Sequence, residues 1–349
     1  MPAKSTKHIL VIRFSAMGDV AMTVPVILAV VQQHPNVKVT VTSREQYKPF
    51  FDGIPGVNFL YADFNKEHKG ILGLWKLYRH LRSLHIYAVA DLHNVLRSKI
   101  ITRLFALRGK KTATTDKMRD RRKLLTAAKD KVFEPLPAVT QRHADVFAQL
   151  GLPVSLEGNL FLSKQQLTDD ITGITGLKTG TWIGIAPFAQ HKSKVYPKDL
   201  MQQVINTLAQ DTGTTLLLFG GGKREIHLLK NYAGDKPNVI VIAGGKMILK
   251  QELKLISNLD LMLSMDSANA HMAALFNIKT ITLWGATHPY AGFTPFKQPL
   301  EHALVSDREQ YPMLPTSVYG NKAVPGYEDA MRTITPNAVV AKINEVLGR

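Results

Sequence analysis

Residues 261–276, LMLSMDSANAHMAALF, decide how the chain is expected to fold. The apolar run Leu261–Met265 has the length and bulk of a buried parallel strand, and a helix-like segment follows Asp266 at once. Such a junction leaves backbone N–H groups at the helix start, where they and the helix dipole favour a phosphate. Because Asp is also a common N-cap residue, this stretch leaves two interpretations open: a phosphate site, or a carboxylate that only caps a helix.

Similar strand-like and helix-like runs alternate along most of the chain, which predicts parallel α/β sheets. We expect strands at residues 8–13, 37–42, 57–61, 87–91, 182–186, 215–219, 239–242, 261–265 and 279–283. We expect helices at residues 20–33, 71–84, 93–107, 142–150, 200–210, 225–232, 249–257, 267–276 and 336–347.

The length of the chain favours two domains, because 349 residues with 45% hydrophobic content are many for one core. Residues 151–181 show no strong period, so we place the boundary there. We expect an N-terminal Rossmann-like domain over residues 1–165 and a C-terminal Rossmann-like domain over residues 166–335. The last helix, residues 336–349, is expected to pack back on the N-terminal domain. The expected fold class is α/β, with two Rossmann-like domains facing a cleft and ligands at the carboxyl ends of the strands.

The chain is strongly basic, with 44 Lys and Arg against 27 Asp and Glu and a formal net charge of +17. This excess favours an anionic partner: nucleic acid, an acidic membrane surface or a phosphorylated substrate. Ten of the cations lie in residues 108–131, which form either a basic patch or a solvated loop. No helix-turn-helix, zinc or RNP signature accompanies them, so a nucleic-acid-binding protein is the alternative and not the preferred interpretation.

Other compositional features exclude several classes of protein. The chain has no cysteine, which excludes disulfides, thiolate metal sites and cysteine nucleophiles. No apolar run approaches the length that spans a membrane, and residues 1–7 do not resemble a signal peptide. We therefore expect a cytoplasmic protein, with at most peripheral contact to a membrane.

Two carboxylates stand at equivalent places in the two halves of the chain. Asp19 ends the loop at residues 14–19, which comes after the first strand. Asp266 comes directly after the strand at residues 261–265. Each lies beside a helix start, where the helix dipole favours the ionised acid. An ionised Asp19 suits a general base acting on a hydroxyl nucleophile; the alternative is a simple N-cap.

The sequence lacks the usual phosphate and metal signatures. Residues 14–19 contain no Gly-x-Gly-x-x-Gly, and Gly220-Gly221-Gly222-Lys223 lacks the Ser or Thr of a P-loop. No Asp-x-Asp occurs, so the usual carboxylate pair for a metal-bound nucleotide sugar is missing. Lys, Arg and helix N-termini must then meet a diphosphate charge. The cationic loop at residues 186–197 fits that need, unless it is only a solvated basic loop.

Five motifs follow one another along the chain: Ser15-Ala16-Met17-Gly18-Asp19-Val20, Asp91-Leu92-His93-Asn94 with Arg97-Ser98, Lys194-Val195-Tyr196-Pro197, Lys246-Met247, and Ser264-Met265-Asp266-Ser267 with His271. In order and spacing they resemble the family 9 glycosyltransferases, the ADP-heptose:lipopolysaccharide heptosyltransferases. The resemblance covers nearly the whole chain.

This resemblance implies a GT-B type fold in which the domain over residues 1–165 binds the acceptor and the domain over residues 166–335 binds the nucleotide sugar. It implies an inverting, metal-independent transfer of heptose from ADP-heptose to the inner core (Kdo or heptose) of lipopolysaccharide, with peripheral contact to the inner membrane. It implies no cofactor, no metal ligand and no nucleic acid partner. It suggests Asp19 as the catalytic base. The donor-binding residues that it implies are Lys194, Met247, Asp266, Ser267, Ala268 and His271. The acceptor-binding residues are Ser15, Gly18, His93, Asn94 and Arg97.

The chain departs from the family pattern at three places. Asp266-Ser267-Ala268 stands where the family often has Asp-Thr-Gly, and Ala189-Gln190 where it often has Thr or Ser. Residues 317–322 resemble a subgroup that carries nearby cysteines, which are absent here. Two further alternatives keep the fold: a different nucleotide-sugar donor, or a member that no longer catalyses. The presence of both Asp19 and Lys194 argues against the second.

Overall fold

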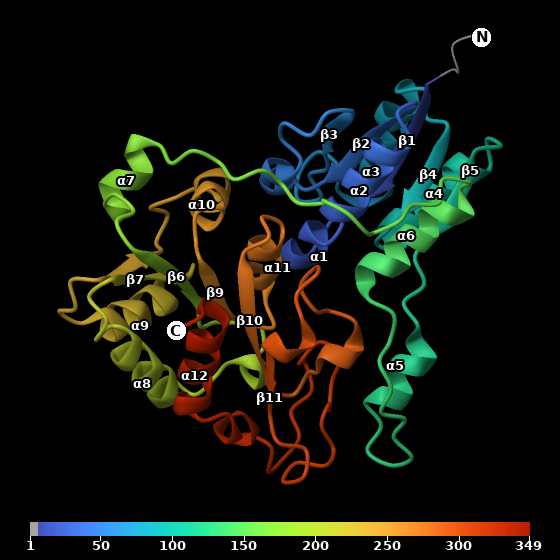
Figure 1. The fold of residues 1–349 in the computed structure, drawn as a ribbon. Helices are drawn as coiled ribbons and strands as arrows, with labels where there is room; N and C mark the ends of the chain where they lie inside the picture. The colour runs from blue at the N-terminus through green and yellow to red at the C-terminus, as the bar shows by residue number, and fades with distance from the viewer. Residues whose placement is uncertain (1–5) are drawn as a thin grey trace. The chain divides into compact units, whose positions relative to one another are not determined.

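The computed structural model describes residues 6–349, so the expectation for residues 1–7 falls mostly outside it. The chain divides into two α/β units (Figure 1). Unit 1 comprises Met1–Lys117 and Ala138–Phe161, and unit 2 comprises Met118–Pro137 and Leu162–Arg349. After its return to unit 1 the chain re-enters unit 2 at Leu162, and the domain division expected after residue 165 stays a prediction. Residues 118–137 were wrongly assigned to the N-terminal domain, because the chain enters unit 2 there before returning to unit 1.

Unit 1 is built on a five-stranded parallel sheet in the order β3-β2-β1-β4-β5. Residues 9–12 in its central strand are fully buried, which explains their continuous apolar run: both faces of the strand are covered. The strands are β1 (Lys7–Ile12), β2 (Val37–Ser43), β3 (Val57–Tyr61), β4 (Ala88–Asp91) and β5 (Lys111–Thr114).

Helices cover both faces of this sheet. Leu74, Leu77 and Phe105 of α3 and α4 pack into one apolar core with Leu10 and Ile12 of β1, while α2 packs with α6 and β2. The helices of unit 1 are α1 (Met17–Ala21), α2 (Val24–Gln33), α3 (Gly70–Ser83), α4 (Leu96–Ala106) and α6 (Val139–Gln149), with a 3₁₀ helix η1 (Glu45–Phe50).

The single helix expected over residues 20–33 is wrong, because two helices, α1 and α2, occupy this stretch. Pro25 lies in the first turn of α2, where backbone N–H groups have no hydrogen-bond acceptor within the helix. A proline, which lacks the N–H, therefore costs no helical hydrogen bond there. Thr23 is the N-cap residue of α2, and its hydroxyl donates to the Val20 carbonyl at 2.7 Å. The stretch therefore forms two helices separated by a turn at residues 22–23.

Unit 2 is built on a six-stranded parallel sheet in the order β11-β10-β9-β6-β7-β8. In chain order this is the 3-2-1-4-5-6 arrangement of a Rossmann fold, read from β8. Its strands are β6 (Thr181–Ala186), β7 (Thr214–Phe219), β8 (Val239–Ile242), β9 (Leu261–Met265), β10 (Lys279–Trp284) and β11 (Ala303–Val305). The α/β class with Rossmann-like domains is thus confirmed.

The helices of unit 2 are α5 (Arg119–Leu125), α7 (Asp169–Thr175), α8 (Lys198–Leu208), α9 (Lys223–Ala233), α10 (Leu249–Ile256), α11 (Ala268–Ala274) and α12 (Pro336–Leu347). Short 3₁₀ helices are η2 (Lys192–Lys194), η3 (Pro289–Ala291), η4 (Leu300–His302) and η5 (Ala330–Thr333). The helices α8, α9 and α12 lie side by side (Figure 1), and α11 packs on β9 and β10.

The last helix corrects a prediction, because α12 belongs to unit 2 and packs on α8 and β10. Val339, Ile343 and Val346 of α12 are buried in the same core as the strands of this sheet. This apolar stripe at helical spacing takes the helix onto unit 2, rather than back on the N-terminal domain as expected.

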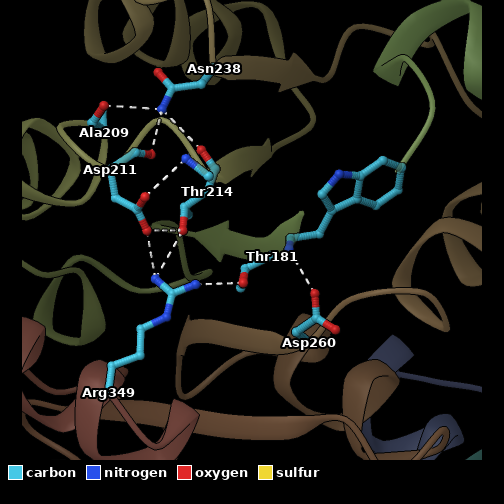
Figure 2. Close-up of polar contacts among 9 residues, drawn as sticks. Thr181, Ala209, Asp211, Thr214, Asn238, Asp260 and Arg349 are labelled. Atoms are coloured by element: carbon cyan, nitrogen blue, oxygen red, sulfur yellow. Dashed lines mark hydrogen bonds and ion pairs between the residues drawn. The ribbon is translucent and has the colours of Figure 1, made fainter. Parts of the chain in front are cut away.

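A polar network at the amino ends of β6 and β7 secures the end of the chain (Figure 2). The Arg349 guanidinium donates to the Asp211 carboxylate at 2.7 Å and to the Thr214 hydroxyl at 3.0 Å. The Asn238 amide donates to the Ala209 and Thr214 carbonyls nearby. This edge is opposite the carboxyl ends of the strands, so the network serves structure.

Residues 118–137 pack on the loops of unit 2 as an aromatic and cationic layer. Leu125 and Leu136 are buried with Ala291, and the Arg308 guanidinium lies 3.3 Å from the centre of the Phe133 ring. Arg122, only 8% exposed, donates to the Tyr319 hydroxyl at 2.6 Å. Residues 108–131 are therefore not one solvated loop, since they include β5, α5 and one buried cation, Arg122.

Candidate active site

Both units place polar residues at the carboxyl ends of the strands that flank the point where the strand order reverses. In unit 1, the last residue of β1, Ile12, pairs with the last residue of β4, Asp91. Arg13 and Leu92, which come next, therefore lie beside each other at the carboxyl ends of these strands. In unit 2, Ala186 of β6 pairs with Ser264 of β9, just before Asp266. Ligands of open α/β sheets bind at such switch points.

Asp19 lies in the first turn of α1, where an arginine holds its carboxylate. The Arg13 Nη2 lies 2.8 Å from Asp19 Oδ2, and the side chains are 10% and 27% exposed. The Arg13 Nη1 donates to the Leu92 carbonyl at 2.7 Å, which fixes the guanidinium. Asp19 is not the N-cap residue of α1, which is Ala16, although its carboxylate accepts the Ala16 N–H at 3.3 Å. Asp19 therefore caps the helix start as the N3 residue of a capping box, in addition to pairing with Arg13.

Asp91 organises the loop between β4 and α4. This fully buried carboxylate accepts the backbone N–H groups of His93 and Asn94 and the Ser98 hydroxyl, each at 2.9 Å. Burial raises the pKa of Asp91, although these hydrogen bonds oppose the shift. Asp91 thus acts as a buried anchor, and the residues that it positions are those of the predicted acceptor site.

His93 contributes a neutral imidazole beside the Asp19 loop. Its Nδ1 accepts the Phe14 N–H at 3.4 Å, which leaves Nε2 as the protonated nitrogen. Burial, followed by the nearby charges of Arg13 and Lys117, lowers the pKa of His93 to about 3. The ring is therefore a neutral hydrogen-bond donor at pH 7, which suits binding of an oxygen atom better than accepting a proton.

The structure brings most of the predicted acceptor residues together around these two loops. Ser15 and Gly18 lie in the loop and first turn that carry Asp19. The Arg97 guanidinium is exposed and lies 4.9 Å from the centre of the Phe64 ring, which itself packs on Phe14. Asn94 is an exception: its amide donates to the Thr115 carbonyl at 2.7 Å, and its Oδ1 is buried. Asn94 therefore serves the turn, where it adopts a φ of 53°.

In unit 2, Lys194 and Asp266 form a buried ion pair. The Lys194 Nζ lies 2.9 Å from Asp266 Oδ2, with side-chain exposures of 13% and 8%. The Thr287 hydroxyl donates to the same oxygen at 2.9 Å. Because the N-cap residue of α11 is Ser267, the interpretation that Asp266 only caps a helix is wrong. Lys194 retains further N–H donors for an anion.

The loop at residues 317–320 packs against Lys194. The Gly320 carbonyl accepts the Ser193 hydroxyl at 2.6 Å, and the Ser317 hydroxyl accepts the Gly320 N–H at 2.9 Å. A Cβ at Gly320 would lie 2.4 Å from Lys194 Cδ, and the φ of +78° is a conformation that favours glycine. Only glycine therefore allows the lysine stem to pass at this position.

The remaining predicted donor residues lie at the same edge of the sheet. The Ser267 hydroxyl contacts the Ser264 hydroxyl at 3.0 Å, Ala268 begins α11, and His271 is buried within that helix. Met247 is also buried and follows β8, three strands from β9. Strand spacing puts these two strands about 14 Å apart, so only an extended ligand would reach both Met247 and Asp266.

Sequence reasoning missed Arg13, Thr287 and Gly320 as members of these sites. Arg13 carries a signal, since it is a cation placed directly after a buried strand. Thr287 follows β10, the strand beside β9, and has the weaker signal of a polar residue after a strand end. Gly320 has no local signal, because its role depends on Lys194. Among residues 6–349, no three His, Asp or Glu side chains gather as a metal site.

Two Rossmann-like units, each with polar groups at its switch point, define the GT-B class of glycosyltransferase folds. The sequence pattern of glycosyltransferase family 9 (heptosyltransferase) matches residues 74–322. The chain belongs to this family and is a glycosyltransferase.

Individual relatives agree with this assignment. The chain is 22% identical over 290 residues to the lipopolysaccharide core heptosyltransferase OpsX of Haemophilus influenzae. The aligned residues cover 82% of this chain and 81% of that protein. A family 9 glycosyltransferase from Veillonella parvula has a similar structure, with a TM-score of 0.75, 18% identity and coverage of 99% and 98% of the two chains. The structure of the E. coli heptosyltransferase WaaC with ADP is also similar, with a TM-score of 0.66 and 19% sequence identity. The match covers 97% of this chain and 99% of that chain.

Proposed function

We propose that the protein transfers heptose from ADP-heptose to the inner core, Kdo or heptose, of lipopolysaccharide, with inversion and without a metal. The observation that carries this proposal is the buried Lys194–Asp266 pair at the carboxyl end of β9, which falls on the donor motif of the family. The donor and acceptor classes are supported by similarity to WaaC, solved with ADP, and to a lipopolysaccharide core enzyme.

On the acceptor side, Asp19 is the general base. It takes the proton from the acceptor hydroxyl as that oxygen attacks the anomeric carbon from the face opposite ADP, which gives inversion. Arg13 lies 2.8 Å from the carboxylate and orients it. The neutral His93 offers its Nε2–H to an acceptor oxygen. Base catalysis of this kind contributes on the order of 10²–10⁴ in rate.

On the donor side, Lys194 binds the diphosphate. Bond cleavage leaves the electron pair on the β-phosphate oxygen of ADP, and a fixed cation opposes the negative charge that develops there. Asp266 and Thr287 fix the Lys194 ammonium from one side, and Gly320 lets the stem pass from another. Met247, about three strand spacings away, would contact the adenine, with Ser267, Ala268 and His271 around the donor sugar and diphosphate.

Metal independence rests on the donor chemistry that the chain offers. Lysine supplies the cation, and the sequence contains no Asp-x-Asp. The proposed acceptors are lipid-linked, so the proposal includes a cytoplasmic protein in peripheral contact with the inner membrane, without nucleic acid as a partner.

A donor screen tests the proposal. The enzyme is incubated with a Kdo-containing lipid acceptor and, in turn, ADP-heptose, ADP-glucose and UDP-sugars, with and without EDTA, and release of the nucleoside diphosphate is measured. We expect release with ADP-heptose that EDTA does not change. Turnover only with another donor would reject the heptose assignment, and a strict Mg²⁺ requirement would reject the metal-independent mechanism.

A further inference from the structure

The helix α3 has two unlike faces. Leu74, Leu77 and Leu81 are buried in the core of unit 1. On the other side, Ile71 and Leu72 are 80% and 85% exposed and Trp75 is 46% exposed. Isolated apolar residues on a surface need no explanation, but three within five residues of one helix form a patch.

Exposed cations lie on the same helix and on the segments before and after it. Residues 66–111 contain eleven Lys and Arg, all exposed, against two carboxylates. One of these, Glu67, pairs with Lys76 at 2.8 Å, and the other, Asp91, is fully buried. Leu72, Trp75, Lys76 and Arg79 follow helical spacing, so apolar and cationic side chains share one face. The helix α4, which packs on α3, adds exposed Leu, Arg and Lys side chains.

We propose that this exposed face of α3 docks the protein on a bilayer surface that contains anionic phospholipids. Ile71, Leu72 and Trp75 enter the boundary between headgroups and acyl chains, and the surrounding cations bind lipid phosphates. Charge complementarity selects this partner, since Lys and Arg near an anionic leaflet attract it strongly. A face that joins Leu and Trp to Lys and Arg is the signature of helices that lie in the interface.

The other partners that this charge suggests fit the face less well. Nucleic acid would pair with the cations but would leave Ile71 and Leu72 in water. No helix among residues 6–349 is long and apolar enough to cross a bilayer, so α3 lies on the surface. The inference rests on the proposed function, because a lipid-linked acceptor must be met at a membrane, and it names the surface that makes this contact.

Tryptophan fluorescence gives a direct test, because the chain has three tryptophans and Trp182 and Trp284 are each only 1% exposed. A change of emission on membrane binding therefore reports Trp75. The protein is titrated with vesicles of phosphatidylglycerol and phosphatidylethanolamine that contain no lipopolysaccharide, and with vesicles of phosphatidylcholine. We expect a blue shift with the anionic vesicles alone, weakened by salt. No binding, or binding without a change in emission, would overturn the proposal.

Variants locate the contact. Leu72→Gln should weaken binding to the anionic vesicles by about tenfold, because an apolar side chain no longer enters the boundary. Arg79→Glu should weaken it by about tenfold or more. Leu177→Gln is the matched control, since Leu177 is 77% exposed in unit 2, and should change nothing. An equal loss of vesicle binding in the Leu177→Gln control would overturn the proposal. So would a protein that binds DNA in a gel shift but does not bind the anionic vesicles.

A separate assay keeps this proposal distinct from the proposed function. With a water-soluble acceptor fragment, Leu72→Gln should retain the turnover of the unsubstituted enzyme. Vesicle binding through Trp75 without any heptosyl transfer would reject the transferase reaction and support the docking surface. Transfer to the soluble acceptor without vesicle binding would reject the docking surface alone.

Discussion

Replacing Lys194 and Asp266 singly and together separates two roles of the buried pair: holding unit 2 together and binding the donor. In Lys194→Met, the Asp266 carboxylate loses its cation while only 8% exposed. Breaking a buried pair from one side costs about 3–5 kcal/mol. Because the Thr287 hydroxyl still donates to the carboxylate at 2.9 Å, we expect the lower end, about 3 kcal/mol of unfolding free energy.

The double variant Lys194→Met/Asp266→Asn removes the unpaired charge. We expect it to recover about 2 kcal/mol of the stability lost in Lys194→Met, a coupling of the size found for contacting residues. ADP affinity should behave differently. Loss of a hydrogen bond from a charged donor costs about 1.5–3 kcal/mol, so both variants should bind ADP roughly 10- to 100-fold more weakly.

Urea unfolding gives the stabilities, and isothermal titration calorimetry gives the ADP affinities. Lys192→Met is the control, because Lys192 lies in the same 3₁₀ turn but is exposed, and it should change neither quantity. Recovery of ADP affinity in the double variant would refute the reasoning, since Lys194 would then act only by neutralising Asp266.

Three further changes have defined outcomes. Arg13→Met should lower kcat by about tenfold to a hundredfold, because Asp19 is no longer held, while calorimetry shows unchanged ADP affinity; an unchanged kcat would contradict this. Gly320→Ala should weaken ADP binding, since its methyl group displaces the Lys194 stem, and normal affinity with normal stability would refute that packing role. Burial lowers the pKa of His143 to about 3, below its value of 6.5 when unfolded. Between pH 6.5 and 3 the unfolded chain binds a proton on His143 and the folded protein does not. The free energy of unfolding is therefore undiminished above pH 6.5 and decreases by about 1.4 kcal/mol per pH unit as the pH falls toward 3. Urea unfolding between pH 7 and 4 should show that His143→Gln reduces this slope, and an unchanged slope would exclude the histidine.

The local pattern of the chain was enough to predict the α/β class. Residues 9–12 and 261–265 are apolar because central parallel strands are covered on both faces, and this burial leaves a direct mark in the sequence. The same pattern placed Asp19 and Asp266 after strands. It could not show where the chain crosses between units, because residues 118–137 join unit 2 through contacts such as Phe133 on Arg308.

The partners of the candidate site residues were predictable only in part. Thr287 lies 21 residues from Asp266 and reaches it because β10 pairs with β9, an order that no local pattern contains. Gly320 lies 127 residues from Ser193, which it contacts. For α12, the apolar stripe showed that one face is buried but not which unit buries it. Side-chain partners that depend on strand order or on long-range packing require the structure.

The turnover of Asp19→Asn tests the central claim most directly. The amide is isosteric with the carboxylate and can still accept the Ala16 N–H, so the fold and ADP affinity should persist. Without a base, kcat for transfer from ADP-heptose to a Kdo-containing acceptor should fall by about two to four orders of magnitude, while the melting temperature changes little. A retained kcat would contradict the account and remove Asp19 from the mechanism.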